Sequence, residues 1–299
     1  MTVYFPSYYK EFRCIADRCR HSCCVNWEIG LDDATMAKYS SLEGTLGDDI
    51  RSHISMDESV IRLCDNGSCP FLDERGLCRI ISSIGEENVS DICREHPRFY
   101  HRVGDRIEGG IGASCEEAAR IILSSNSYSH FFATEREVDV AEETDFDSLT
   151  HREYIYSLIS DSSLSYDQRM NMIREKYDLP TSFDPEYWNE ILKDLEYLDP
   201  SREGNIRIGE EEAQAEIQSY LIGFFAYLVF RHVSIADSYD NLRARVGFCL
   251  LLSSVLENMI AERDLTFADI CECARIISEE IEYSEDNTAS LIFEMECII

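Results

Sequence analysis

Lysine and positive charge are scarce in this chain of 299 residues. The chain has 27 basic residues, of which only four are lysines (Lys10, Lys38, Lys176 and Lys193). It has 58 Asp and Glu residues, so its net charge is −31. Nucleic acids and anionic membranes both bind basic surfaces. We therefore expect no nucleic acid and no membrane as partner, whereas the negative field favours solubility or a cationic partner. A further interpretation is that the protein modifies lysine side chains and presents few of its own.

Apolar runs long enough to cross a membrane are also absent from the sequence. The longest one, Tyr220 to Phe230, ends at Arg231-His232 and is shorter than the roughly 20 residues that a helix needs to span a bilayer. Residues 1–10 lack the basic and apolar segments of a secretory signal. We therefore expect a cytoplasmic protein with reduced thiols, whose cysteines bind metal rather than form disulfides.

Eight cysteines in the first 115 residues are the main feature that is present. Soft thiolate ligands select zinc, copper(I) or an iron–sulfur cluster, and four of them satisfy either tetrahedral zinc or a cubane cluster. Neither the C-x2-C of zinc knuckles nor the C-x3-C-x2-C of radical S-adenosylmethionine enzymes occurs. The spacing alone leaves zinc and iron–sulfur open, including a metal that only supports folding. The predicted metal ligands are Cys14, Cys19, Cys23, Cys24, Cys69, Cys78, Cys93 and Cys115.

The composition changes near residue 125 and predicts two domains. Residues 1–125 form an irregular, cysteine-rich metal-binding domain with two short helices, one capped by Asp32 and one preceded by a capping box of Ser114 and Glu117. Glycines 109, 110 and 112 are interpreted as a turn rather than as a nucleotide fingerprint. Residues 126–299 form an acidic α-helical domain that begins with a linker, 126–148. The fold class is therefore mainly α, with an all-helical C-terminal part.

Helical periodicity predicts six helices after this linker, and a second capping box, Thr266 with Asp269, opens the last of them. Four cysteines in this part, Cys249, Cys271, Cys273 and Cys297, are expected to be small core residues. The predicted helices are 151–160, 166–178, 185–198, 210–232, 236–262 and 267–282.

The cysteine-rich half resembles the flagellin lysine-N-methylase family, which is itself similar to YkgJ-type cysteine-cluster domain proteins. The matching segments are Y-K-E-F-R-C-I-A-D-R-C-R-H-S-C-C-V-N-W-E-I, C-P-F-L-D-E-R-G-L-C-R-I, D-I-C-R-E-H-P-R and S-C-E-E-A-A-R. They lie between about residues 8 and 125 and include all eight cysteines.

The resemblance implies N-methylation of lysines on flagellin, with S-adenosylmethionine as the methyl donor and an iron–sulfur cluster, 4Fe-4S, held by four of these cysteines. The first set to consider is drawn from Cys19, Cys23, Cys69, Cys78 and Cys93. A lysine must lose its proton before it accepts a methyl group, because its usual pKa is about 10.4. Glu28, beside Trp27, is the predicted base. The alternative is a non-catalytic zinc- or iron-binding interaction module or metallochaperone.

Overall fold

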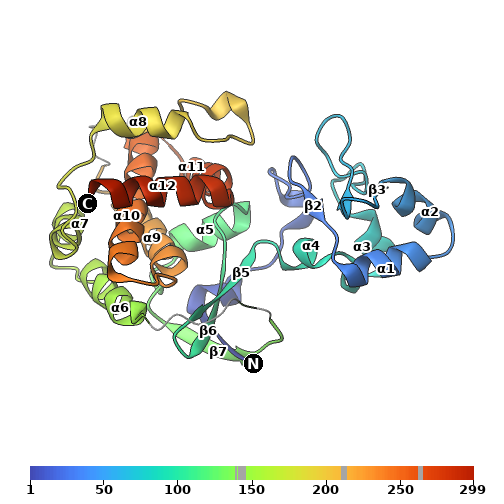
Figure 1. Cartoon of the computed structure of the whole chain (residues 1–299), viewed down its shortest axis with the longest axis horizontal. Helices are drawn as coiled ribbons and strands as arrows, with labels where there is room; N and C mark the ends of the chain where they lie inside the picture. The colour runs from blue at the N-terminus through green and yellow to red at the C-terminus, as the bar shows by residue number, and fades with distance from the viewer. Residues whose placement is uncertain (139, 141–145, 210–213, 262–264) are drawn as a thin grey trace. The chain divides into compact units, whose positions relative to one another are not determined.

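The chain folds into two compact units, here in a computed structural model that describes residues 1–138, 140, 146–209, 214–261 and 265–299 (Figure 1). Unit 1 comprises Met1–Phe12 and Phe99–Ile299, and unit 2 comprises Arg13–Arg98. Unit 2 is therefore inserted into the sequence of unit 1. These units do not coincide with the predicted ranges 1–125 and 126–299, because the first twelve residues and residues 99–125 pack with the helical part.

Unit 2 consists of short elements around a small apolar core. The N-terminal cap of its first helix is confirmed, because the Asp32 carboxylate accepts a hydrogen bond of 2.8 Å from the Thr35 backbone N–H. The core contains Tyr39, Ile50 and Phe71. The helices are α1 (Asp33–Ser41), α2 (Thr45–Ser52), α3 (Arg79–Ile84), α4 (Asp91–Glu95) and the 3-10 turns η2 (Ala16–Arg18) and η3 (Glu86–Asn88); the strands are β2 (Ile29–Gly30), β3 (Ile54–Ser55) and β4 (Val60–Ile61), in the order β2-β4-β3.

Unit 1 contains a four-stranded sheet that the sequence analysis did not predict. Its strands are β1 (Thr2–Pro6), β5 (Arg98–Val103), β6 (Arg106–Ile111) and β7 (Phe131–Glu135), in the order β5-β6-β1-β7. Strand β1 is parallel to β6 and antiparallel to β7, so that Phe5 lies opposite Phe132. The mainly α class is confirmed, but the expectation of an all-helical part after residue 125 is wrong. The reason is that β7 is stabilised by pairing with a segment more than a hundred residues away, which a local pattern does not reveal.

The helices of unit 1 largely follow the predicted periodicity. All six predicted helices are present, although several end earlier, and the predicted start at residue 210 lies outside the described residues. The helix after residue 284 was not predicted. The helices are α5 (Glu116–Ser124), α6 (Ser148–Ile159), α7 (Tyr166–Lys176), α8 (Pro185–Lys193), α9 (Gln218–Leu228), α10 (Tyr239–Ala261), α11 (Phe267–Ile277) and α12 (Glu285–Ile298), with the 3-10 turns η1 (Ser7–Glu11) and η4 (Pro200–Arg202).

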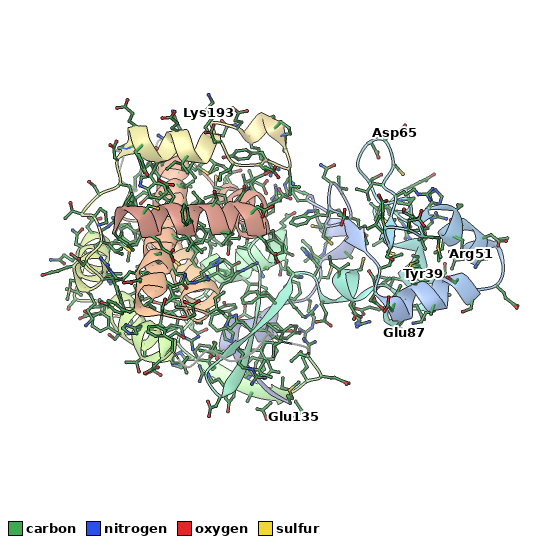
Figure 2. All side chains as sticks on the ribbon, in the orientation of Figure 1. Tyr39, Arg51, Asp65, Glu87, Glu135 and Lys193 are labelled. Carbon is green, nitrogen blue, oxygen red and sulfur yellow. The ribbon has the colours of Figure 1, made fainter. Side chains whose placement is uncertain are left out.

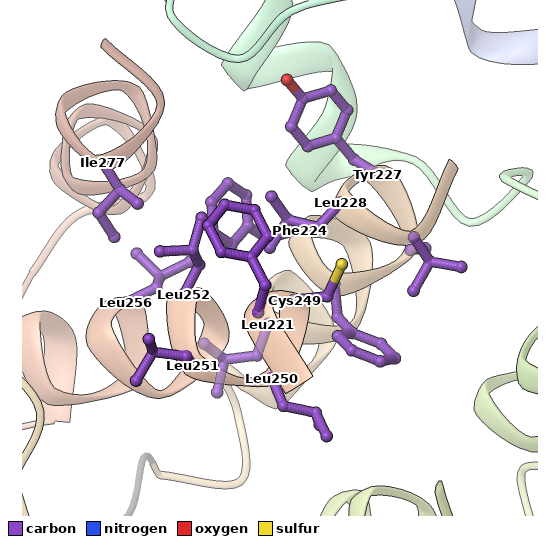
Figure 3. Packing of buried hydrophobic residues seen from close by; sticks show 14 of the residues in the cluster. Leu221, Phe224, Tyr227, Leu228, Cys249, Leu250, Leu251, Leu252, Leu256 and Ile277 are labelled. Atoms are coloured by element: carbon purple, nitrogen blue, oxygen red, sulfur yellow. The ribbon is translucent and has the colours of Figure 1, made fainter. Parts of the chain in front are cut away.

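Helix α10 is the centre of the unit 1 core. It packs against α9, α11 and α12, and Leu251, Leu252 and Leu256 on it are fully buried (Figure 3). Among the described helices it is the one that is long and apolar enough to cross a membrane, but 72% of its apolar window is buried inside the unit. Core packing therefore accounts for its hydropathy. The predicted burial of Cys249, Cys271 and Cys273 is confirmed, whereas Cys297 is exposed near the end of α12.

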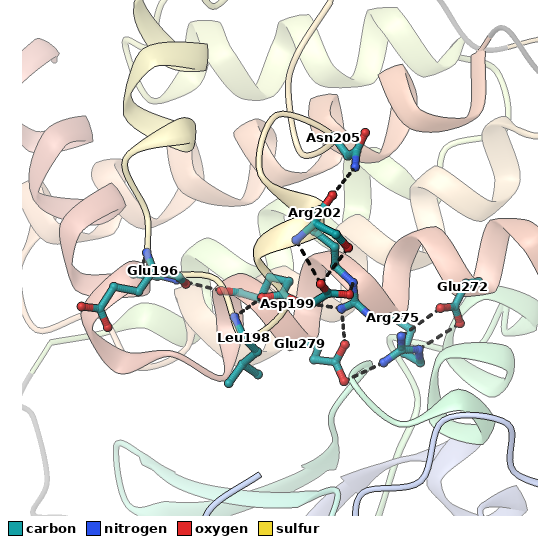
Figure 4. A network of polar contacts seen from close by, with 11 residues as sticks. Glu196, Leu198, Asp199, Arg202, Asn205, Glu272, Arg275 and Glu279 are labelled. Carbon is teal, nitrogen blue, oxygen red and sulfur yellow. Dashed lines mark hydrogen bonds and ion pairs between the residues drawn. The ribbon is translucent and has the colours of Figure 1, made fainter. Parts of the chain in front are cut away.

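Two of the helices continue as π-helices. Val229–Val233 (η5) follows α9, and Ser278–Glu282 (η6) follows α11. Ion pairs fix η6 against the segment that follows α8: Arg202 contacts Glu279 and Glu280, and Arg275 reaches Glu279 at 2.8 Å (Figure 4). Such wide turns are rare and occur often at functional sites.

Candidate metal centre

Two neighbouring loops of unit 2 bring Cys24 and Cys69 together. The Cys69 backbone N–H donates a hydrogen bond of 2.7 Å to the Cys24 carbonyl, and an isolated β-bridge joins Val25 to Ser68. A tight turn at Gly67 (φ +77°) makes this pairing possible, because a Cβ there would lie 1.9 Å from the Asn26 side chain. Glycine at this position thus fixes the approach of two cysteines that are distant in sequence.

A second turn adds Cys78, and helix α4 adds Cys93. A β-bridge joins Leu72 to Cys78, and the Arg79 N–H donates to the Phe71 carbonyl at 2.7 Å. Cys78 is the N-cap residue of α3, and Cys93 lies in the single turn and a half of α4. Both helices therefore start or run at the edge of the same small core.

The four thiols lie close enough to influence one another electrostatically. Burial, with a smaller contribution from negative charge on Cys24, Cys78 and Cys93, raises the pKa of the Cys69 thiol to about 12. Burial also raises the pKa of Cys93, with added repulsion from Cys24 and Cys78. Mutual repulsion of this kind is a property of thiols gathered at one place, and a bound cation removes it. We refer to Cys24, Cys69, Cys78 and Cys93 as the thiol cluster.

Tyr39 on α1 is a buried aromatic residue of unit 2 and is labelled in Figure 2. Its side chain is 1% exposed, and its hydroxyl donates a hydrogen bond of 2.9 Å to the Asn88 carbonyl. Burial raises its pKa, and so do the charges of Cys93, Cys78 and Cys69. The Tyr39 ring therefore belongs to the buried core of unit 2.

Neighbouring donor groups favour the ionised form of three of the four thiols. The Cys23 thiol lowers the pKa of Cys24 to about 7, with help from the Ser22 hydroxyl, and the Phe71 N–H lowers that of Cys69. The Ser90 hydroxyl lowers that of Cys93, against the effect of burial. Donors of this kind stabilise a thiolate, which is the form that ligates metal.

The other four predicted ligands are placed differently. Cys14 and Cys23 are exposed, as Cys93 of the thiol cluster also is, Cys23 adjoins Cys24, and the Cys19 thiol donates to the His21 carbonyl at 3.3 Å. Cys115 belongs to unit 1, where it is the N-cap residue of α5. The predicted capping box before α5 is wrong, since the helix begins without a side-chain cap. Glu28 is exposed just before β2, and its role as a base stays a prediction.

The donor set of the thiol cluster suits a soft metal or an iron–sulfur cluster. Outside residues 139, 141–145, 210–213 and 262–264, no three or more His, Cys, Asp or Glu side chains are already arranged as a metal-holding group. Four thiols without a metal have no attraction for one another, because they are neutral or, when ionised, repel. The residue types, four cysteines on neighbouring loops and short helices of unit 2, are the ligands that such a group requires.

Unit 1 holds a second polar arrangement that sequence reasoning missed. Glu108 on β6 is fully buried and receives hydrogen bonds of 2.5 and 2.8 Å from the Arg152 guanidinium on α6. It also contacts Arg106 and lies 3.5 Å from His101. Burial alone raises the pKa of this carboxyl, but the hydrogen bonds from Arg152 and the nearby His101 ring hold it well below its usual range. This ion pair joins the sheet to the helices.

A third arrangement lies between the two π-helices. Glu282 on η6 accepts a hydrogen bond of 3.1 Å from the Tyr227 hydroxyl and lies 2.8 Å from Nε2 of His232 on η5. Arg231 lies between the rings of Phe99 and Tyr283, at 4.8 and 4.5 Å from their centroids. No sequence signal for this network was available, since its members come from segments about fifty residues apart.

The glycine-rich segment serves this packing and is not a turn. Gly109 and Gly110 lie within strand β6, where a Cβ would come within 2.5 Å of the Phe5 and Phe99 rings respectively. A Cβ at Gly112 would lie 2.0 Å from the Tyr283 hydroxyl. The expectation of a turn is therefore wrong, because these glycines provide space for aromatic side chains within a strand and its extension.

Comparisons with known proteins place the chain beside flagellar and lysine-modifying proteins. The Lysine-N-methylases of Salmonella typhimurium and Salmonella choleraesuis are each 30% identical to it over 136 residues, which is 42% of this chain and 33% of theirs. The match thus spans about a third of their length. No family model matches the chain, and neither does any solved structure.

The flagellar biosynthetic protein FliU of Salmonella muenchen is matched over more of its length. It is 30% identical over 137 residues, which is 42% of this chain and 78% of FliU. Similarity at this level over most of a relative accords with the cysteine motifs of the N-terminal half. The chain belongs to the lysine-N-methylase and FliU family.

Proposed function

We propose that this protein transfers methyl groups from S-adenosylmethionine to lysine side chains of a flagellar protein, with flagellin as the substrate and an iron–sulfur cluster on the thiol cluster. Family membership carries the proposal, because the relatives are named for lysine N-methylation and for flagellar biosynthesis. The four cysteines that unit 2 carries on neighbouring loops and on α4 support the cluster as candidate ligands. The chain's net charge of −31 supports a lysine-bearing partner.

The methyl transfer needs a neutral lysine amine in line with the carbon–sulfur bond of the sulfonium. The amine nitrogen forms the new bond to the methyl carbon, the bond from that carbon to sulfur breaks, and the amine proton leaves to a base. Since a solvated lysine is almost fully protonated at neutral pH, the site must desolvate the ammonium or accept its proton. Alignment of the two reactants supplies a large part of the remaining acceleration.

Cys24, Cys69, Cys78 and Cys93 are the residues that hold the cluster in this proposal. This set includes Cys24, whereas the set expected from the sequence included Cys19 and Cys23 and left Cys24 out. When bound, an iron–sulfur cluster supplies a Lewis-acidic and redox-active group. The protein's own contribution is to supply four thiolates from neighbouring loops and short helices of unit 2.

Metal analysis of cysteine variants tests the cluster. The protein is purified without oxygen and its iron, sulfide and zinc contents are measured; we expect about four iron and four sulfide per chain. Cys69→Ser and Cys93→Ser are expected to lose the iron, whereas Cys64→Ser, an exposed cysteine of the same unit, keeps it. Zinc alone after anaerobic reconstitution would contradict the cluster and favour the non-catalytic metal module.

Incubation with purified flagellin and methyl-labelled S-adenosylmethionine tests the activity. Mass spectrometry is expected to find labelled methyl groups on flagellin lysines, and flagellin whose lysines have been acetylated beforehand serves as the unreactive control. Transfer that is weaker at high ionic strength is expected if the negative surface attracts the substrate. No label on flagellin from an iron-loaded preparation would refute the proposed substrate.

A further inference from the structure

Helix α12 has an apolar stripe on its outer face as well as on its inner face. A surface helix normally has one apolar stripe, which faces the core, and a helix that is apolar all round is covered on every side. The inner stripe of α12 includes Leu291 and Met295, which are fully buried. On the outer face Ala289, Phe293 and Cys297 follow one another at intervals of four residues, so they share one side of the helix, and all three are exposed.

The neighbouring helix α8 extends this apolar surface. Phe293 is 64% exposed, more than any other large apolar side chain in the described part of the chain. Tyr187 on α8 is 38% exposed, and its hydroxyl donates a hydrogen bond to the Glu294 carboxylate, which fixes α8 beside α12 (Figure 1). Apolar surface that two helices share in this way is typical of an interaction site. We refer to the outer stripe of α12 together with the exposed side of α8 as the α8–α12 face.

Uncompensated carboxylates surround the apolar side chains of the α8–α12 face. The sequence contains no lysine or arginine after Arg275. Helix α8 adds Glu186 and Glu190 and has a single cation, Lys193. The acidic residues of α12 are Glu285, Asp286, Glu294 and Glu296. None of these four makes an ion pair with any residue that the structure describes, so the face is both apolar and strongly negative.

The negative charge selects the partner of the α8–α12 face. A second copy of the chain would bring the same carboxylates into contact and be repelled, and so would a nucleic acid or an anionic membrane. A protein segment with lysines beside apolar side chains buries the Phe293 ring and compensates the carboxylates. Helix α7 shows the contrast, since it exposes Met172 but carries Arg169 and Lys176 next to its acidic residues.

We infer that the α8–α12 face is a docking surface for a lysine-bearing, partly apolar segment of the protein substrate. The inference rests on the proposed function for the identity of this partner. The face binds the substrate and takes no part in the transfer itself. A substrate held there presents its lysines to the protein at a high effective concentration, so loss of the face raises the KM for the protein substrate and leaves kcat unchanged.

Binding of purified flagellin to four variants of the full chain tests the docking surface. Phe293→Ala removes the exposed ring and is expected to raise the Kd about tenfold, whereas Met172→Ala on α7 leaves it unchanged. Glu190→Lys is expected to raise the Kd about two- to fivefold and to weaken its dependence on salt. Glu175→Lys on α7 changes the net charge by the same amount at another exposed position and is the matched control.

A photo-crosslink locates the bound segment directly. Phe293→benzoylphenylalanine is expected to crosslink to a flagellin peptide that contains lysine, and Met172→benzoylphenylalanine is expected to give no such product. Both positions are exposed, so neither substitution disturbs the core of unit 1.

Three results would overturn the docking surface. The first is equal weakening by Glu190→Lys and Glu175→Lys, which would mean that only the overall field attracts the substrate. The second is a dimer of the unaltered protein that dissociates in Phe293→Ala, which would assign the face to a second copy. The third is an unchanged Kd in Phe293→Ala, which would leave the proposed function standing. Flagellin that is neither bound nor methylated by the unaltered protein would instead overturn the proposed substrate, and this inference with it.

Discussion

Removing the Arg152 guanidinium is expected to destabilise unit 1 strongly. Arg152→Met keeps a long apolar side chain but leaves the fully buried Glu108 without its bidentate partner at 2.5 and 2.8 Å. Breaking a buried ion pair by removing one partner costs about 3–5 kcal/mol. Arg106, whose side chain is 28% exposed, still contacts the carboxylate, so we expect the lower end of that range, about 3 kcal/mol.

Tryptophan fluorescence during thermal unfolding measures this effect in unit 1. The chain has two tryptophans, and Trp27→Phe leaves Trp188, which is 1% exposed in the unit 1 core, as the reporter. For a unit of 150–250 residues each kcal/mol lowers Tm by about 2–4 °C, so Arg152→Met should lower it by about 6–12 °C. Arg120→Met removes the half-exposed pair with Glu117 and is the control, at less than about 1 kcal/mol.

A second variant separates the charge effect from lost packing. Glu108→Gln combined with Arg152→Met removes both charges, so the double variant should be less destabilised than the sum of the two single variants. If Arg152→Met unfolds within 1 °C of the parent protein, or if the two substitutions are additive, the assigned role of this ion pair is refuted.

Three further predictions concern pH, packing and capping. Burial lowers the pKa of His101 and His232, so as the pH falls the unfolded state takes up protons on these residues before the folded state does. The free energy of unfolding in urea should therefore be fully present above the unfolded pKa of about 6.5 and decrease progressively below it. A free energy of unfolding that stays constant from pH 7.5 to 5.5 would contradict this. Gly112→Ala places a Cβ 2.0 Å from a tyrosine hydroxyl and should lower Tm clearly, whereas Gly30→Ala, with nothing within 4 Å, should change it little. Asp32→Ala removes the cap of α1 and the acceptor for α4, and should lower the free energy of unfolding of unit 2 by about 1–2 kcal/mol in chemical denaturation; no change would exclude the capping role.

Local sequence signals predicted local structure well. The Asp32 cap and the capping box of Thr266 and Asp269 are confirmed, because each depends on side chains within three residues of one another. The box of Ser114 and Glu117 fits the same pattern but does not form, since α5 begins one residue later than the box requires. The capping motifs therefore predicted correctly that a helix is present, but they predicted its first residue less accurately.

Long-range arrangements were not predictable from the same signals. Strand β1 gives no helical or strand pattern that predicts its pairing with both β6 and β7. The cysteine spacing left open which of Cys23 and Cys24 approaches the other thiols, whereas in the structure the Cys24 carbonyl accepts a hydrogen bond from the Cys69 N–H. The ion pair of Glu108 and Arg152 joins residues 44 positions apart.

The insertion of unit 2 between β1 and its partners imposes an order on synthesis. The ribosome completes all of residues 13–98 before it makes β6 and β7, with which β1 pairs. At about 5–20 residues per second, β1 waits about 6 to 26 seconds for the second of these strands. During that interval the nascent chain carries all of unit 2 together with an unpaired apolar strand, β1. Metal can therefore be delivered to unit 2 before unit 1 has folded. The unpaired backbone of β1 is the segment that chaperones must protect from aggregation.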